Sequence, residues 1–261
     1  MKIAVTGKGG VGKTTLSSIL CHLFASEGKK VIAVDADPDA NFASALGVPR
    51  EEAAKIRPIA ELGELIEERT GSKPGGMGGI FKLNPKVDDL PEGLGYKMNG
   101  ITLLIMGKSK SAASGCYCPE NVLLRMLLKH LVVERDEVVI VDMEAGIEHL
   151  TRGTAGSVDA FLVVVEPGQR SMQTAGVVQD MARDLGVKKV FVVANKVRGP
   201  EDLEFIKKGI GTIEIAGHIS FSHDVMEADI KGASPFSFSP GTVEEVKKIK
   251  DVIEKKMLHA G

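Results

Sequence analysis

The stretch that decides the fold is Gly7-Lys8-Gly9-Gly10-Val11-Gly12-Lys13-Thr14-Thr15, which directly follows the apolar run Ile3-Ala4-Val5. Its glycines carry no side chains, so bare backbone N–H groups can fold around an anion. A helix expected from Thr14 to about Glu27 would aim its positive end at the same anion. A strand, a glycine-rich loop and a helix in this order predict a phosphate-binding loop.

Within this loop we expect the backbone of residues 7–15 to bind the phosphates of a nucleotide. Lys13 is the candidate for contacting the β- and γ-phosphates, and the Thr14 hydroxyl for binding Mg²⁺.

Size and charge narrow the class of protein. The chain has 261 residues, of which 43% are apolar and 4% aromatic, which suits one α/β domain over residues 1–261 with an aliphatic core. A net charge of −2 gives no electrostatic footprint for nucleic acid. No apolar run is long enough for a membrane span or a signal peptide. We expect a cytoplasmic protein with neither nucleic-acid nor membrane partners.

The pattern along the chain alternates between two kinds of segment. Short β-branched runs occupy residues 31–35, 101–106, 138–142, 161–166, 190–195 and 213–217, and helical periodicity occupies residues 16–24, 122–132, 174–185 and 243–257. Strands this apolar are covered on both faces. The alternation predicts a mostly parallel, doubly wound α/β sheet of about seven or eight strands flanked by helices, with ligands at the carboxyl ends of the strands.

One segment interrupts this alternation. Residues 71–100 are rich in glycine and proline, which predicts a long insertion between two sheet elements. A surface excursion and a lid that responds to nucleotide or partner are equally open interpretations.

Carboxylates and an amide stand where the predicted strands end. Asp35, Asp37 and Asp39 follow the second strand, beside the expected γ-phosphate, where hydrolysis needs a group to orient water. Asp142 ends the run 138–142 and is a second candidate for the Mg²⁺ site. Asn195 ends another strand, and its acceptor and donors suit an adenine edge. The guanine-specific Asn-Lys-x-Asp pattern is not met, which favours ATP over GTP.

Two cysteines suggest a metal site shared between chains. Cys116 and Cys118 precede a helix expected to begin at Pro119, where the positive helix end favours thiolates. Two sulfurs supply half of the four ligands that a zinc-like ion takes, so a symmetric homodimer would complete a four-sulfur site. Cys21 lies among apolar residues and is expected to be a core residue.

The loop resembles the deviant Walker A signature of the ParA/MinD class of dimeric ATPases because Lys8 is its second residue. The resemblance implies that Lys8 reaches the partner's nucleotide across a two-fold interface and acts in catalysis. It also implies that Asp37, in an Asp-x-Asp-Pro segment, orients water. It further implies that Asn195 contacts adenine and that residues 219–224 cover the ring.

Three motifs together are similar to the CooC-type ATPases that help insert nickel into carbon monoxide dehydrogenase: residues 7–15, Gly115-Cys116-Tyr117-Cys118-Pro119-Glu120-Asn121 and Asp142-Met143-Glu144-Ala145-Gly146-Ile147-Glu148-His149. The resemblance implies an ATP-hydrolysing homodimer that binds Ni²⁺ or Zn²⁺ through Cys116 and Cys118. Its implied client is carbon monoxide dehydrogenase or acetyl-CoA synthase. An iron–sulfur cluster carrier, or a positioning ATPase of the ParA/MinD type, remains an alternative.

Overall fold

The computed structural model describes residues 1–37, 39–74, 81–107, 118–133, 135–144, 158–187 and 189–258. Within these ranges, eight strands form one sheet in the order β3-β4-β2-β5-β1-β6-β7-β8. The strands are β1 Lys2–Gly7, β2 Val31–Asp35, β3 Tyr96–Met98, β4 Ile101–Ile105, β5 Val138–Asp142, β6 Ala160–Val165, β7 Val190–Val197 and β8 Glu214–Ser220. All pairings are parallel except β3 with β4, which confirms the predicted sheet.

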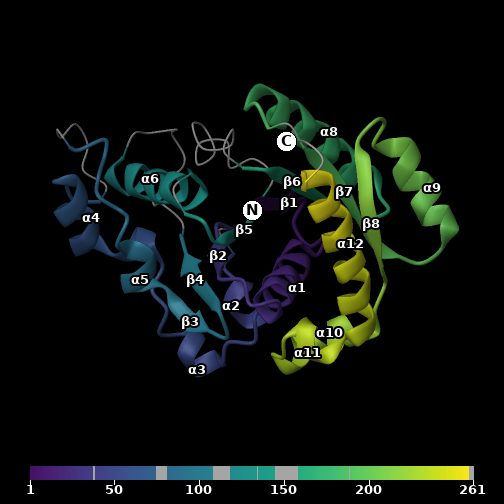
Figure 1. Ribbon diagram of the computed structural model, residues 1–261, viewed down its shortest axis with the longest axis horizontal. Coiled ribbons are helices and arrows are strands. Elements are labelled where there is room, and N and C mark those ends of the chain that lie inside the picture. The colour runs from purple at the N-terminus through teal and green to yellow at the C-terminus, as the bar shows by residue number, and fades with distance from the viewer. Residues whose placement is uncertain are drawn as a thin grey trace.

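Helices cover both faces of this sheet, as the apolar strands require (Figure 1). Their bounds are α1 Lys13–Ser26, α2 Phe42–Ala45, α3 Arg50–Ala53, η1 Ile59–Glu61, α4 Gly63–Thr70, α5 Leu90–Leu94, α6 Pro119–Val133, α8 Gln169–Asp184, α9 Pro200–Gly209, α10 His223–Lys231, α11 Pro235–Phe238 and α12 Pro240–Leu258. Helices α1 and α12 pack on one face, and α6, α8 and α9 pack on the other. Each face has its own aliphatic core.

The glycine- and proline-rich segment contributes to the sheet more than its composition suggested. It contains α5 and the edge strand β3. Val87 and Leu90 anchor it, with exposed fractions of only 6% and 2%, because they pack into the core beneath α6. Pro91 stands in the first turn of α5, where a missing N–H costs no helical hydrogen bond. Residues 75–80, which the lid interpretation includes, lie outside the described residues.

The order of the strands shows at which point of the sheet a ligand site is expected. The chain runs from β1 to β2 on one side and later returns to β6 on the other, so β1 lies where the winding reverses. In doubly wound sheets, ligands bind at the carboxyl ends of the strands at such a point. The glycine-rich loop leaves β1 there.

Candidate functional site

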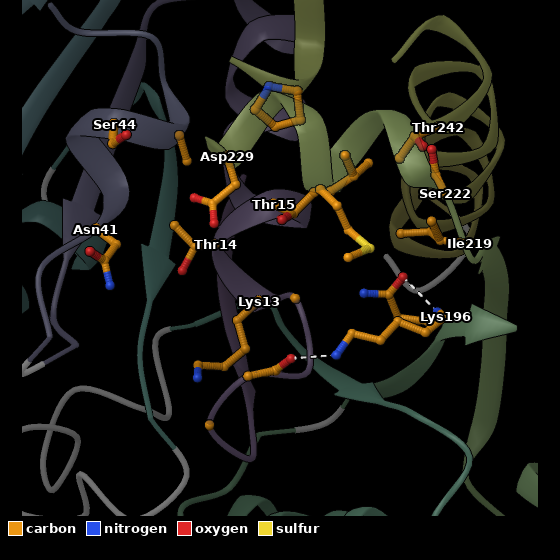
Figure 2. A pocket seen from close by; sticks show the side chains of 18 of the residues that line it. Lys13, Thr14, Thr15, Asn41, Ser44, Lys196, Ile219, Ser222, Asp229 and Thr242 are labelled. Carbon is orange, nitrogen blue, oxygen red and sulfur yellow. Dashed lines mark hydrogen bonds between the residues drawn. The ribbon is translucent and has the colours of Figure 1, made fainter. Parts of the chain in front are cut away.

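A cavity of about 560 Å³ opens at the carboxyl ends of five strands. Residues that follow β1, β2 and β5 line it, with the last residues of β7 and β8 and parts of α2, α10 and α11. Figure 2 shows Lys13, Thr14 and Thr15 in the middle of this lining, Asn41 and Ser44 on one side, and Lys196, Ile219, Ser222 and Thr242 on the other. The structure therefore brings the predicted phosphate and base residues into one cavity.

The loop between β1 and α1 has a backbone that only glycine adopts easily. Gly10 and Gly12 have φ values of 77° and 97°. A Cβ atom on Gly12 would also overlap the side-chain amide of Asn195. Helix α1 begins immediately after Gly12, and its first hydrogen bond runs from Leu16 N–H to Gly12 O at 3.1 Å. The first amides of α1 therefore face the cavity, as an anion site requires.

Lys13 and Asp37 form an ion pair at the floor of the cavity. The distance between Lys13 Nζ and Asp37 Oδ2 is 3.4 Å, and their side chains are only 5% and 12% exposed. Lys13 Nζ also donates to the carbonyl of Lys8 at 3.4 Å. The Asp37 backbone is held by Asp35, whose Oδ1 accepts the Asp37 N–H at 3.2 Å. The structure thus places Lys13 beside Asp37, the candidate for orienting water. The side chain of Lys8 is half-buried.

Asp142 and Asp35 are buried neighbours because β2 pairs with β5 in a register that makes them partners. Burial raises the pKa of Asp142 to about 6, against the opposing effects of the Thr14 hydroxyl and the Lys13 charge. Burial likewise raises the pKa of Asp35 to about 7, although the Phe42 N–H donates to this carboxylate. Within the described part of the chain, neither carboxylate oxygen of Asp142 has a hydrogen-bond partner. A buried oxygen pair beside Thr14 fits a divalent cation.

Asn195 lies under the phosphate loop as well as in the cavity. Its Nδ2 donates to Val11 O at 2.7 Å, and its Oδ1 accepts the Lys196 N–H at 2.8 Å. An amide has a second donor and a second lone pair, so one of each remains for a base. The predicted adenine contact is therefore compatible with this geometry, but the amide first serves the loop.

The far end of the cavity has the character of a base pocket. Ile219, Phe221 and Ser222, from the segment expected to cover the ring, line it together with Thr242. The guanidinium of Arg198 lies 5.0 Å from the centroid of the Phe221 ring. An aromatic ring in the lining is a surface on which a purine can stack, and the Arg198 charge adds a cation–π contact to that ring.

The cysteine prediction is only partly within the described residues. Cys116 lies outside them, as do Ala145 to His149 of the third motif. Cys118 is buried and lies directly before α6, which begins at Pro119 as predicted. Cys21 is a core residue, and burial raises the pKa of its thiol well above the usual value. No group of three or more metal-ligating side chains occurs within the ranges that the structure describes.

Sequence reasoning missed two charged residues at this site. Lys196 donates to Gly10 O and pairs with Glu166. Lys196 comes after the apolar run of β7, and Glu166 comes directly after β6. Their positions at strand ends were the only sequence signal that could have marked them as site residues.

Comparison with known proteins identifies the family of this chain. The family described as the CobQ/CobB/MinD/ParA nucleotide binding domain matches residues 2–236. The chain is 48% identical over 240 residues to the carbon monoxide dehydrogenase accessory protein CooC of Rhodospirillum rubrum, covering 92% of this chain and 91% of that one. It is also 48% identical over 259 residues, 98% of both chains, to an uncharacterized ATP-binding protein of Methanocaldococcus jannaschii.

A solved structure shows the same fold at lower identity. The septum site-determining protein MinD with Mg-ADP from Pyrococcus horikoshii superposes with a TM-score of 0.68 at 18% identity, covering 97% of this chain and 96% of that one. The 48% identity to CooC confirms the resemblance drawn from the three motifs. The chain belongs to the CobQ/CobB/MinD/ParA family of nucleotide binding domains and is of the CooC type within it.

Proposed function

We propose that this chain is a cytoplasmic, ATP-hydrolysing accessory protein of carbon monoxide dehydrogenase that assists nickel insertion into that enzyme or into acetyl-CoA synthase. The observation that carries the proposal is the 48% identity to the CooC accessory protein over 92% of this chain. The cavity at the sheet edge supports it, because its lining combines a phosphate loop with a pocket for a base.

In this proposal the chain's own residues divide the work on ATP. The amides of residues 7–15 bind the phosphates, and Lys13 leaves Asp37 to contact the β- and γ-phosphates. Asp37, released from Lys13, orients the attacking water. Thr14 and Asp142 would bind Mg²⁺, which neutralises charge on the β- and γ-phosphate oxygens when bound. Asn195 and the segment 219–224 bind the adenine.

Two independent sequence features support a homodimer. Lys8 is the second residue of the phosphate loop, the position that reaches the partner's nucleotide in the deviant Walker A class. Cys116 and Cys118 supply half of a four-sulfur site for Ni²⁺ or Zn²⁺ as cargo. ATP would close the dimer and form the thiolate site, and hydrolysis would open it and release the metal to the client enzyme.

The test is a titration of the purified chain with Ni²⁺ or Zn²⁺, with and without ATP, followed by native mass spectrometry. We expect one metal ion per dimer in the presence of ATP. Cys116→Ser with Cys118→Ser should abolish this binding, whereas Cys21→Ala, which changes the buried third cysteine, should leave it intact.

Two results would contradict the proposal. One is a single protomer saturated with nickel and indifferent to ATP. The other is a broad charge-transfer absorption from iron and sulfide in protein purified without oxygen, which would instead indicate an iron–sulfur cluster carrier.

A further inference from the structure

Lys196 contacts the phosphate loop from the strand β7. Its Nζ donates to Gly10 O at 2.7 Å, and the same atom lies 2.9 Å from Glu166 Oε2. Figure 2 shows this side chain extending from its strand to the loop, with the bond to Gly10 dashed. The ammonium group is thus shared between a loop carbonyl and a carboxylate.

The backbone of β7 is distorted where this contact originates. Lys196 has a φ of 57°, and in the described part of the chain Asn99 is the only other residue besides glycines with positive φ. The pairing of β7 with β8 also shifts register between Ala194 and Val197. Neighbouring side chains of a regular strand point to opposite faces, whereas here Asn195 and Lys196 both contact the same loop.

These two contacts determine which way the loop amides face. In a planar trans peptide, the C=O of one residue and the N–H of the next point in opposite directions. Lys196 binds the carbonyl of Gly10, and Asn195 binds the carbonyl of Val11. Both carbonyls are therefore held on the β7 side, and the N–H groups of Val11 and Gly12 are directed away from it. A phosphate needs donors and is repelled by carbonyl oxygens.

We propose that Lys196 and Glu166, with Asn195, form a clamp that holds the phosphate loop in its binding conformation before nucleotide arrives. Lys196 and Glu166 are positioning residues that act through the loop. Glu166 keeps the ammonium group over Gly10, and its own N–H donates to the Ser171 hydroxyl in the first turn of α8 at 3.4 Å. The proposal rests on the proposed function only in taking the ligand to be a nucleotide.

The test separates loop positioning from direct phosphate binding by measuring the chain without nucleotide. Amide hydrogen exchange of a peptide that covers residues 7–15 reports how often the loop opens. Lys196→Met keeps the aliphatic stem and removes the charge. Lys207→Met is the matched control, because Lys207 is also paired with a glutamate, Glu204, but lies on α9 outside the cavity lining.

We expect Lys196→Met to accelerate exchange in residues 7–15 by about ten-fold, the effect of losing one charge-assisted hydrogen bond. The dissociation constants of ADP and ATP should rise by one common factor, at most about ten-fold, because affinity falls with the fraction of chains whose loop is closed and both nucleotides need the closed loop. Lys196→Arg should restore most of the protection, and Lys207→Met should change neither quantity. If Lys196→Met does not fold, Glu166→Gln, which loosens the ammonium group without removing it, should show a smaller acceleration.

Unchanged exchange in Lys196→Met would overturn the clamp, and weaker nucleotide binding in that case would identify Lys196 as a direct phosphate ligand. Faster exchange with a higher dissociation constant for ATP but not for ADP would overturn it equally, because both nucleotides need the same loop. Because exchange is measured on the nucleotide-free chain, a failure of the metal titration above would leave this result standing.

Discussion

Replacing Asp142 by asparagine should change the pH dependence of the nucleotide-free chain's stability. The side chain is 1% exposed, and within the described residues its two oxygens have no hydrogen-bond partner. The substitution keeps the shape and removes the charge. We expect the variant to be more stable than the wild type at neutral pH and unable to support Mg²⁺-dependent hydrolysis of ATP.

The magnitude follows from the pKa. Burial raises the pKa of Asp142 from 3.8 to about 6. A raised pKa in the folded state means that this carboxyl favours folding fully below its unfolded pKa and loses that contribution as pH rises through its folded pKa. A difference of about two pKa units corresponds to about 3 kcal/mol of unfolding free energy. That amount should be lost between about pH 4 and pH 6, and remain lost at pH 7.

Two effects modify this value. A buried amide that lacks partners costs about 1–3 kcal/mol, and the Thr14 and Ser17 hydroxyls, which lower the pKa of the wild-type carboxyl, would need a small shift to pair with it. The Asp142 charge is also one cause of the raised pKa of Asp35, so its removal lowers that pKa as well. We therefore expect a net gain of about 1–2 kcal/mol at pH 7 and a flatter pH profile.

The assay is urea unfolding from pH 4 to pH 8 in the presence of a chelator, so that no divalent cation binds. Asp88→Asn is the control, because that side chain is 57% exposed. If the stability of Asp142→Asn and of the wild type changes with pH in the same way over the whole range, burial does not raise the pKa of Asp142, and this prediction is wrong.

Three further results are expected. Gly12→Ala should raise the dissociation constant of ADP at least about 100-fold by calorimetry, because its φ of 97° and the adjacent Asn195 amide both exclude a methyl group; affinity within a few-fold of wild type would refute this. Asp37→Asn should retain ATP binding but slow hydrolysis by about 100-fold or more in a phosphate-release assay, as expected when the group that orients water is lost; an unchanged rate would remove Asp37 from the mechanism. Phe221→Ala should weaken ATP and ADP about equally, by roughly 1 kcal/mol, because it lines the base end of the cavity; equal binding of ATP by variant and wild type would show that the base does not stack there.

Much of the fold could be predicted because its signals are local. Buried strands reveal themselves by continuous apolar runs, and the predicted runs at residues 31–35 and 138–142 coincide with β2 and β5. The helix expected at Pro119 begins there because proline suits a first helical turn. The edge strand β3 was not predicted, because three residues between glycines carry too little periodicity to identify.

Some of the site residues could likewise be predicted from the sequence, and others could not. The phosphate loop could be read from residues 7–15 because its glycines, lysine and threonine are adjacent in the chain. The use of Asn195 and Lys196 could not, because these residues lie 184 and 186 positions from the loop carbonyls that they bind. A strand-end residue can be recognised from sequence, but which loop it touches depends on which strands become neighbours.

The amino-acid sequence by itself therefore determined that this chain forms a wound α/β sheet with a phosphate loop after its first strand, since each of those features depends on residues close together in the chain. Only the tertiary structure decided that β2 pairs with β5, so that two aspartates meet in a buried space, and that β7 bulges beneath the loop. Strand order and bulges are set by packing between distant segments, and it is this packing that raises the carboxyl pKa values and orients the loop amides.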